Sequence, residues 1–151
     1  MELLKDHDQE EIFNNEVIMI IDAKDSIMGR VATYAAKQAL LGQEVIIINV
    51  EKAVISGSTE TVVKKYLWRD NLGEPFKGPF MPKIPMKFFK RVIRGMISYK
   101  KERGKLAYKR IKCYPGNPMN VHGISLEKAN YTKLKKGSYI TVGELCKHLK
   151  K

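Results

Sequence analysis

Lysine and arginine side chains gather in one stretch of the sequence, between Lys77 and Lys112. This stretch holds thirteen basic residues and a single acidic residue, Glu102. Cationic side chains at this density bind the phosphates of a polyanion, and each arginine can hold two phosphate oxygens through parallel hydrogen bonds. The chemistry that these residues offer is therefore electrostatic binding of nucleic acid or of another acidic partner.

The spacing of the basic residues predicts that many of them share one face of a helix over about residues 86–100. Pro85 is suited to the first turn of such a helix. At about 100° per residue, the polar and apolar positions occupy separate arcs. The polar arc holds Lys87, Lys90, Arg91, Arg94, Ser98 and Lys101, and the apolar arc holds Phe88, Phe89, Val92, Ile93, Met96 and Ile97. We expect the apolar arc to join the core and the cationic arc to follow a phosphate backbone.

The basic band continues beyond this predicted helix. Its further members are Lys100, Lys101, Arg103, Lys105, Lys109, Arg110 and Lys112. Gly104 within the band is expected to let the backbone turn close to a partner. Phe88 and Phe89 are predicted core residues. Tyr99 and Tyr108 are the better candidates for stacking on nucleobases, with a purely structural role as the alternative.

Catalytic and metal-binding motifs are absent from the sequence. It contains no G-x-G fingerprint, no phosphate-binding loop, no H-E-x-x-H and no G-x-S-x-G. The histidines, His7, His122 and His148, are scattered, and a buried Cys113 is a simpler interpretation than a Cys113–His122 nucleophile and base. Cys113 and Cys146 do not form a C-x-x-C motif or a disulfide framework. We expect no cofactor, metal or small-molecule substrate, and the alternative is an RNA-modifying or nucleotide-using enzyme.

The charge is unevenly distributed along the 151 residues, whose formal net charge is +12. Residues 1–16 hold six acidic residues and one lysine, and we expect them to form an acidic flexible arm. Residues 77–151 hold 20 of the 28 lysines and arginines. A polyanion would relieve the mutual repulsion of these charges. A basic face kept for solubility and a membrane-surface helix are the alternatives.

Targeting signals and membrane spans are not predicted. The longest apolar runs fall far short of the roughly 20 residues that a spanning helix needs. The N-terminus is acidic and lacks the apolar stretch of a secretory signal, so we expect a cytoplasmic protein without membrane contact.

The remaining sequence predicts the elements that position the basic band. The apolar run at 17–22, a helical pattern from Ser26 to about residue 41 and the apolar run at 44–50 together predict a parallel βαβ unit, with Ser26 as the helix cap. Further predictions are a strand at 53–55, a helix opened by Ser56 or Ser58 and reaching about residue 70, a Pro-rich loop at 73–85, and strands at 111–114 and 139–142. Thr141 and Glu144 predict a capping box on a final short helix.

Two segments resemble a known family. They are DAKDSIMGRVATYAAKQALLGQEVIIINVEKAVISG and RVIRGMISYKKERGKLAYKRIKCYPGNP, and they resemble the universal large-subunit ribosomal protein thirteen family in its archaeal and eukaryotic-type branch. The specific features are Gly29-Arg30, the stretch from Asn49 to Gly57, Arg94-Gly95-Met96 and Arg103-Gly104. The resemblance covers about residues 17–118 strongly and YITVGELCKHL more weakly.

The resemblance implies an α/β domain over residues 17–118, with a three-layer α/β/α fold and a small, mostly parallel sheet of about four strands. Residues 119–151 would form a basic C-terminal extension whose short helix packs on the domain. The implied role is that of a structural, noncatalytic protein of the large ribosomal subunit, which binds rRNA, supports assembly and contacts neighbouring ribosomal proteins. The candidate RNA-binding residues are Arg30, Lys52, Lys77, Lys83, Lys87, Lys90, Arg91, Arg94, Lys100, Lys101, Arg103, Lys105, Lys109, Arg110 and Lys112.

Overall fold

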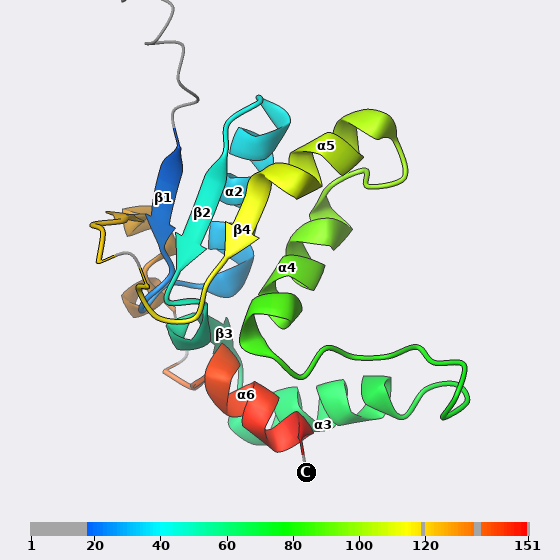
Figure 1. Ribbon diagram of the computed structural model, residues 1–151. Helices are drawn as coiled ribbons and strands as arrows, with labels where there is room; N and C mark the ends of the chain where they lie inside the picture. Colours follow the sequence, from blue (N-terminus) through cyan, green and yellow to red (C-terminus); the bar gives the residue numbers. More distant parts are fainter. Residues whose placement is uncertain (1–17, 119, 135–136, 151) are drawn as a thin grey trace, which may run out of the picture.

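A computed structural model describes residues 18–118, 120–134 and 137–150 of the protein (Figure 1). The predicted acidic arm at residues 1–16 lies outside the described residues.

A four-stranded parallel sheet forms the centre of the fold. Its strands are β1 (Met19–Asp22), β2 (Val45–Ile48), β4 (Ile111–Cys113) and β5 (Ile124–Ser125), in the order β4-β2-β1-β5. All three strand pairs are parallel. Every residue of β2 is buried, as expected of a central strand without alternating polarity. The predicted α/β class and the small parallel sheet are confirmed.

Helix α2 (Met28–Leu40) connects β1 to β2 and lies behind these strands in Figure 1. Its inward side carries small residues, and Ala32, Ala35 and Ala39 are fully buried. Alanine adds no bulk beyond its methyl group, so the helix approaches the sheet closely. The predicted cap by Ser26 is wrong. Ile27 is the N-cap residue and offers no side-chain cap, while the buried Ser26 hydroxyl donates to the carbonyl oxygen of Lys24 at 3.1 Å.

A second, smaller sheet joins distant parts of the chain. Its strands, β3 (Val54–Ser56) and β6 (Tyr139–Thr141), are antiparallel. Helix α3 (Thr59–Asp70) follows β3, with Ser58 as its capping residue. Helix α6 (Val142–Leu149) follows β6 and packs against α3 and the 3-10 helix η1 (Val50–Lys52). The predicted capping box of α6 is confirmed. Two further 3-10 helices, η2 (Glu127–Ala129) and η3 (Tyr131–Lys133), lie between β5 and β6.

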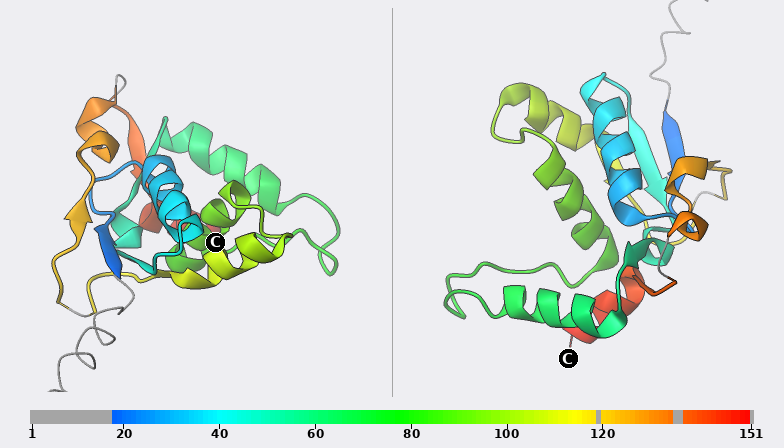
Figure 2. Two further views of the ribbon diagram at one scale, coloured as in Figure 1. Left: turned by 90° about the horizontal axis from the view of Figure 1, so that it is seen from above. Right: turned by 180° about the vertical axis from the view of Figure 1, so that it is seen from behind.

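Helix α4 (Pro85–Met96) takes the place of the helix predicted over about 86–100, and helix α5 (Glu102–Arg110) follows it where no helix was predicted. Ile97 ends α4 with extended backbone angles, φ −109° and ψ 143°, because this conformation buries its side chain in the core. Both helices contact α2, and α4 also contacts the edge strand β4 (Figure 2). The predicted helix over 86–100 is therefore too long, and Ser98 and Lys101 do not continue the cationic face of α4.

Gly104 has a packing role in place of the predicted turn towards a partner. It lies within α5 and is buried. A Cβ atom at this position would stand 2.0 Å from the carbonyl oxygen of Ser98. The missing side chain therefore lets α5 pack directly against the turn that follows α4.

The substitution Gly104→Ala should destabilise the protein by about 1–3 kcal/mol, because the added methyl group meets backbone that cannot rotate away. Gly95→Ala is the matched control. Gly95 lies in α4 with no atom within 4 Å of a built Cβ, so alanine should stabilise the helix by up to about 1 kcal/mol. Urea unfolding followed by circular dichroism measures both values. Equal free energies of unfolding for the two variants would contradict the close packing at Gly104.

Both cysteines are free and belong to the core. Burial raises the pKa of the Cys113 thiol to about 12, against a smaller opposing effect of Lys90. Burial likewise raises the pKa of Cys146 to about 11, opposed by Lys150. The reactive form of cysteine is the thiolate. Both thiols are therefore protonated and poorly reactive at neutral pH.

In the native protein, both thiols should react slowly with the disulfide reagent DTNB at about pH 8. At that pH burial keeps both thiols protonated, because it raises their pKa values well above 8, and the core shields each sulfur from the reagent. In concentrated urea both thiols should react at the rate of a model peptide. The absorbance of the released thionitrobenzoate measures both rates. Rapid modification of either cysteine without urea would contradict its burial.

Candidate nucleic-acid interface

Helix α4 has the predicted apolar and cationic sides, but the prediction is wrong for Met96 of the apolar arc, which is 43% exposed, and Val92 is only partly buried. Its buried residues are Phe88, Phe89 and Ile93, and its cations outside the core are Lys87, Lys90, Arg91 and Arg94. Pro85 occupies the first turn, where its missing N–H breaks no helical hydrogen bond. Burial of the apolar arc fixes the rotation of the helix about its axis. The four cations consequently lie on the side that faces away from the core.

A pocket of about 490 Å³, which we call the α4 pocket, lies against this cationic face. It is lined by Phe80, Pro82, Lys87, Lys90, Arg91, Arg94 and Tyr108. The loop before α4 supplies Phe80 and Pro82, and α5 supplies Tyr108. A guanidinium N–H of Arg91 donates to the carbonyl oxygen of Phe80 and holds the loop against the helix. The fold thus brings four of the candidate RNA-binding residues together in one concave site.

Phe80 is a residue that the sequence analysis did not select. Its side chain is 66% exposed although it is a large apolar ring. The sequence feature that could have identified Phe80 is its position as an aromatic residue in a loop that also holds several prolines and lysines. The spacing of the helix gave no information about this loop, since the contact between Arg91 and Phe80 depends on how the loop folds back.

The two tyrosines selected as stacking candidates each have a cation over one ring face. The Lys90 ammonium lies 4.8 Å from the centroid of the Tyr108 ring, and the Arg94 guanidinium lies 5.1 Å from the centroid of the Tyr99 ring. Burial raises the pKa of Tyr108, against a smaller opposing effect of Arg94. These cation–π contacts hold the cations in place, and they leave less of each tyrosine ring for a ligand.

The other basic residues of the band are spread over three places. Lys100 and Lys101 lie in the turn between α4 and α5, and Arg103, Lys105 and Lys109 lie exposed on α5. Arg110 donates to the carbonyl oxygen of Ala39 at 3.4 Å and so caps the end of α2. Most of the band is therefore an open cationic surface, and Arg110 is hydrogen-bonded to the backbone of α2.

Three of the candidate lysines are engaged in ion pairs. Lys77 pairs with Glu74 at 3.3 Å, Lys83 with Asp70 at 3.1 Å, and Lys112 with Glu44 at 3.5 Å. The Lys77–Glu74 pair is exposed on both sides, whereas Asp70 and Glu44 are partly buried. Ion pairs at a protein surface stabilise a fold by at most about 1 kcal/mol. A phosphate can therefore compete for these lysines at little cost to the fold.

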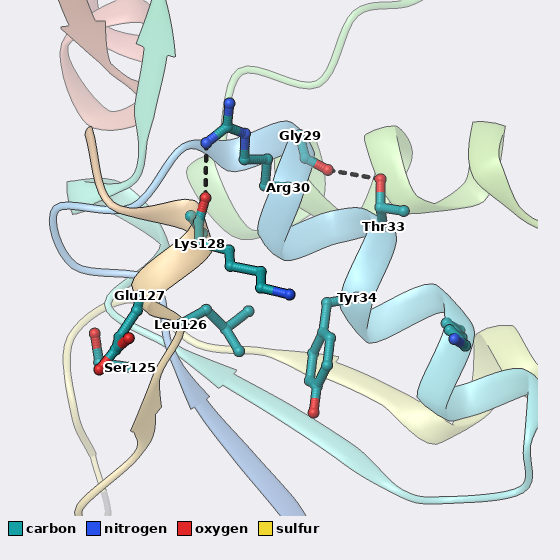
Figure 3. Close-up of a pocket in the computed structure, with 10 residues that line it drawn as sticks. Gly29, Arg30, Thr33, Tyr34, Ser125, Leu126, Glu127 and Lys128 are labelled. Carbon is teal, nitrogen blue, oxygen red and sulfur yellow. Dashed lines mark hydrogen bonds between the residues drawn. The ribbon is translucent and has the colours of Figure 1, made fainter. Parts of the chain in front are cut away.

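Arg30 and Lys52 lie apart from the α4 pocket. Arg30 at the start of α2 donates to the carbonyl oxygen of Lys128 at 2.7 Å (Figure 3). This bond fastens the segment around η2 to the helix and uses only part of the guanidinium. Lys52 in η1 lines a separate pocket of about 430 Å³ with Lys147 and Lys150 of the C-terminal segment. The structure therefore does not join these two residues to the cations of α4.

A further pocket, of about 680 Å³, lies between α2 and residues 125–129. Tyr34 of α2 and Leu126 of the opposite segment supply apolar walls, and the Lys128 side chain extends across the space between them (Figure 3). Only Arg30 among the candidate RNA-binding residues lines it. It is larger than the α4 pocket, and it is mainly apolar.

The described residues bear on two kinds of chemical site considered in the sequence, a metal centre and a cysteine nucleophile. No group of three or more histidine, cysteine, aspartate or glutamate residues within 18–118, 120–134 and 137–150 is placed to share a metal ion. Cys113, the thiol considered as a nucleophile, is buried and protonated. Over the same ranges, no helix combines the length and the apolar character that crossing a membrane requires.

Comparison with known proteins identifies one family. The model of the family described as Ribosomal protein L13 matches residues 16–120. The large ribosomal subunit protein uL13 of Haloarcula marismortui is 43% identical over 131 residues, which cover 87% of this chain and 90% of that protein. The uL13 proteins of Methanococcoides burtonii and Methanopyrus kandleri are 42% and 38% identical, over 86% of this chain and over 96% and 85% of their own lengths, respectively. The members of this family are structural proteins of the ribosome and not enzymes. The chain therefore belongs to the ribosomal protein L13 family, in its archaeal type.

Proposed function

We propose that this protein is a structural constituent of the large ribosomal subunit that binds rRNA through the basic surface of α4 and α5 and supports assembly of the subunit. The observation that carries the proposal is the convergence of four cations on one side of α4, in a chain whose relatives are named large ribosomal subunit proteins. Its partners are then rRNA and neighbouring proteins of the subunit, and its place is the cytoplasm.

The physical support for RNA as the partner is the charge that the fold leaves at its surface. Residues 77–151 hold 20 basic and three acidic residues, and the only described ion pairs of the candidate residues are the three at Lys77, Lys83 and Lys112. The cations of the α4 pocket have no carboxylate beside them in its lining. Phosphates would supply the missing negative charge.

The expected mode of recognition is by shape. The lining of the α4 pocket supplies hydrogen-bond donors in large excess over acceptors, since lysine and arginine only donate. Such groups suit phosphate oxygens and ribose hydroxyls, and among the base edges they match only the acceptor pair O6 and N7 of guanine. The sequence-level alternative, an RNA-modifying or nucleotide-using enzyme, is not supported, because the family is a family of structural proteins.

Binding to isolated large-subunit rRNA should depend steeply on salt. If eight phosphates are neutralised, the logarithm of the association constant should fall against the logarithm of the salt concentration with a slope of roughly −6 to −7. Filter binding between about 50 and 200 mM potassium chloride measures the slope. A slope near −1 would reject a broad cationic interface.

The variant Arg94→Glu should bind rRNA and sediment with large subunits much less than the parent protein. It removes a phosphate-binding group and adds repulsion, and we expect affinity to fall about tenfold or more. Lys64→Glu is the matched control, because it makes the same change of charge at an exposed position of α3. Sucrose-gradient sedimentation of tagged variants expressed in cells gives the comparison.

Both variants should keep their circular dichroism spectra and melting temperatures, since Arg94 and Lys64 are exposed. Equal loss of subunit association in the two variants would show that only net charge matters and would contradict the role of α4.

A further inference from the structure

The α4 pocket combines two kinds of surface that a phosphate-binding face alone does not need. One wall is apolar and is made of the Phe80 ring, Pro82 and the Tyr108 ring, and the other carries four cations. The pocket volume of about 490 Å³ lies within the range of roughly 300–1,000 Å³ that is usual for sites that enclose small molecules. A ligand that matches both walls has a flat apolar part and an anionic part.

A nucleotide has these two parts. Its base presents a planar face that stacks on aromatic rings, and its phosphates are bound by lysine and arginine. A base inside a regular duplex is stacked between its neighbours and offers only its edges to a protein. A nucleotide that enters the pocket must therefore be unpaired, either in a loop or at a bulge where the base can turn out of the stack.

We propose that the α4 pocket receives one unpaired nucleotide of the bound RNA, with its base against Phe80 and its flanking phosphates on the cations of α4. This inference rests on the proposed function and deepens it, because it says which part of the RNA the α4 pocket binds: a nucleotide that is not base-paired.

Phe80 is held in position for this role before any RNA arrives. Arg91 donates to the Phe80 carbonyl oxygen, and this bond anchors the loop from the helix side. From the other side, Gly78 lies beneath the ring, because a Cβ built at Gly78 would stand 3.0 Å from Cδ2 of Phe80. The ring therefore rests on backbone and remains 66% exposed. An aromatic platform fixed in this way loses little conformational entropy on binding.

Phe80 suits the stacking role better than the two tyrosines. Lys90 already lies over one face of Tyr108, and Arg94 over one face of Tyr99. No such cation lies over Phe80 among the cation–π contacts of the described residues. Stacking is tolerant of base identity, and the lining holds no asparagine, glutamine, serine, threonine or carboxylate to read base edges. The site should therefore select for an unpaired base, and guanine is the one base whose edge the lysines and arginines of the lining could also bind.

Two RNA hairpins test the proposal. They are identical except that one carries a single bulged 2-aminopurine and the other is fully paired. The parent protein should bind the bulged hairpin about tenfold more tightly, and its binding should change the 2-aminopurine fluorescence because the base stacks on a ring. Phe80→Ala should abolish both the preference and the fluorescence change while it still binds both hairpins. Phe80→Trp should retain both.

Phe76→Ala is the matched control, because Phe76 is an exposed aromatic residue of the same loop, at 95% exposure, and does not line the pocket. It should keep the preference for the bulge. Melting temperatures of all variants should equal that of the parent, since both side chains are largely exposed.

Equal affinity of the parent for the two hairpins, or a preference that survives in Phe80→Ala, would overturn the nucleotide pocket. Salt-dependent binding of both hairpins in that case would leave the proposed RNA-binding function standing. Failure to bind either hairpin or isolated large-subunit rRNA would overturn both inferences together.

Discussion

Burial of one side of α4 is the constraint on which the rest of the structure depends. Phe89 and Ile93 are fully buried and Phe88 nearly so, and removal of such side chains from water stabilises a fold by about 1.5–3 kcal/mol each. This burial leaves the helix a single permitted rotation about its axis. Lys87, Arg91 and Arg94 are then forced to the opposite side, where they would repel one another in a partner-free protein. The same hydrophobic contacts that build the core therefore also build the cationic site.

Several cationic side chains form hydrogen bonds that hold parts of the fold together. Arg30 and Arg110 each donate to a backbone carbonyl oxygen of a segment remote in the sequence, and Arg91 donates to that of Phe80 in the loop before its own helix. A guanidinium group has five N–H donors, so one bond to the protein leaves others for a phosphate. These arginines can therefore hold the η2 segment, the Pro-rich loop and the end of α2 in place and keep further N–H donors for an anionic ligand. Lysines, which present a compact charge on a flexible stem, instead form the weak ion pairs at the edges of the surface.

Much of the fold could be predicted from short stretches of the sequence. Residues Val45 to Ile48 form an uninterrupted apolar strand, Pro85 starts a helix, and Thr141 with Glu144 forms a capping box, and each was predicted from its neighbours in the chain.

Other features of the fold depend on long-range packing and could not be predicted in this way. The helical pattern continues through Ile97, but the core takes that side chain in an extended conformation, and α4 ends before it. Phe80 joined the site only because Arg91 holds its loop, which no local spacing could reveal. Ser26 turns inward and bonds to Lys24, whereas its position before a helix had indicated a cap.

The pairing of β3 with β6 links residues 54–56 to residues 139–141. During synthesis, β3 leaves the ribosome long before its partner strand exists, so its exposed edge must wait while most of the remaining chain is translated. Helix α6, which closes over η1 and α3, is made later still. Strands β1, β2 and β4 and helix α4 all precede β6 in the chain, whereas the small sheet and the contacts of α6 with α3 and η1 can form only after residues 139–149 have been made. The order of synthesis therefore makes the pairing of β3 with β6 and the packing of α6 late steps in folding.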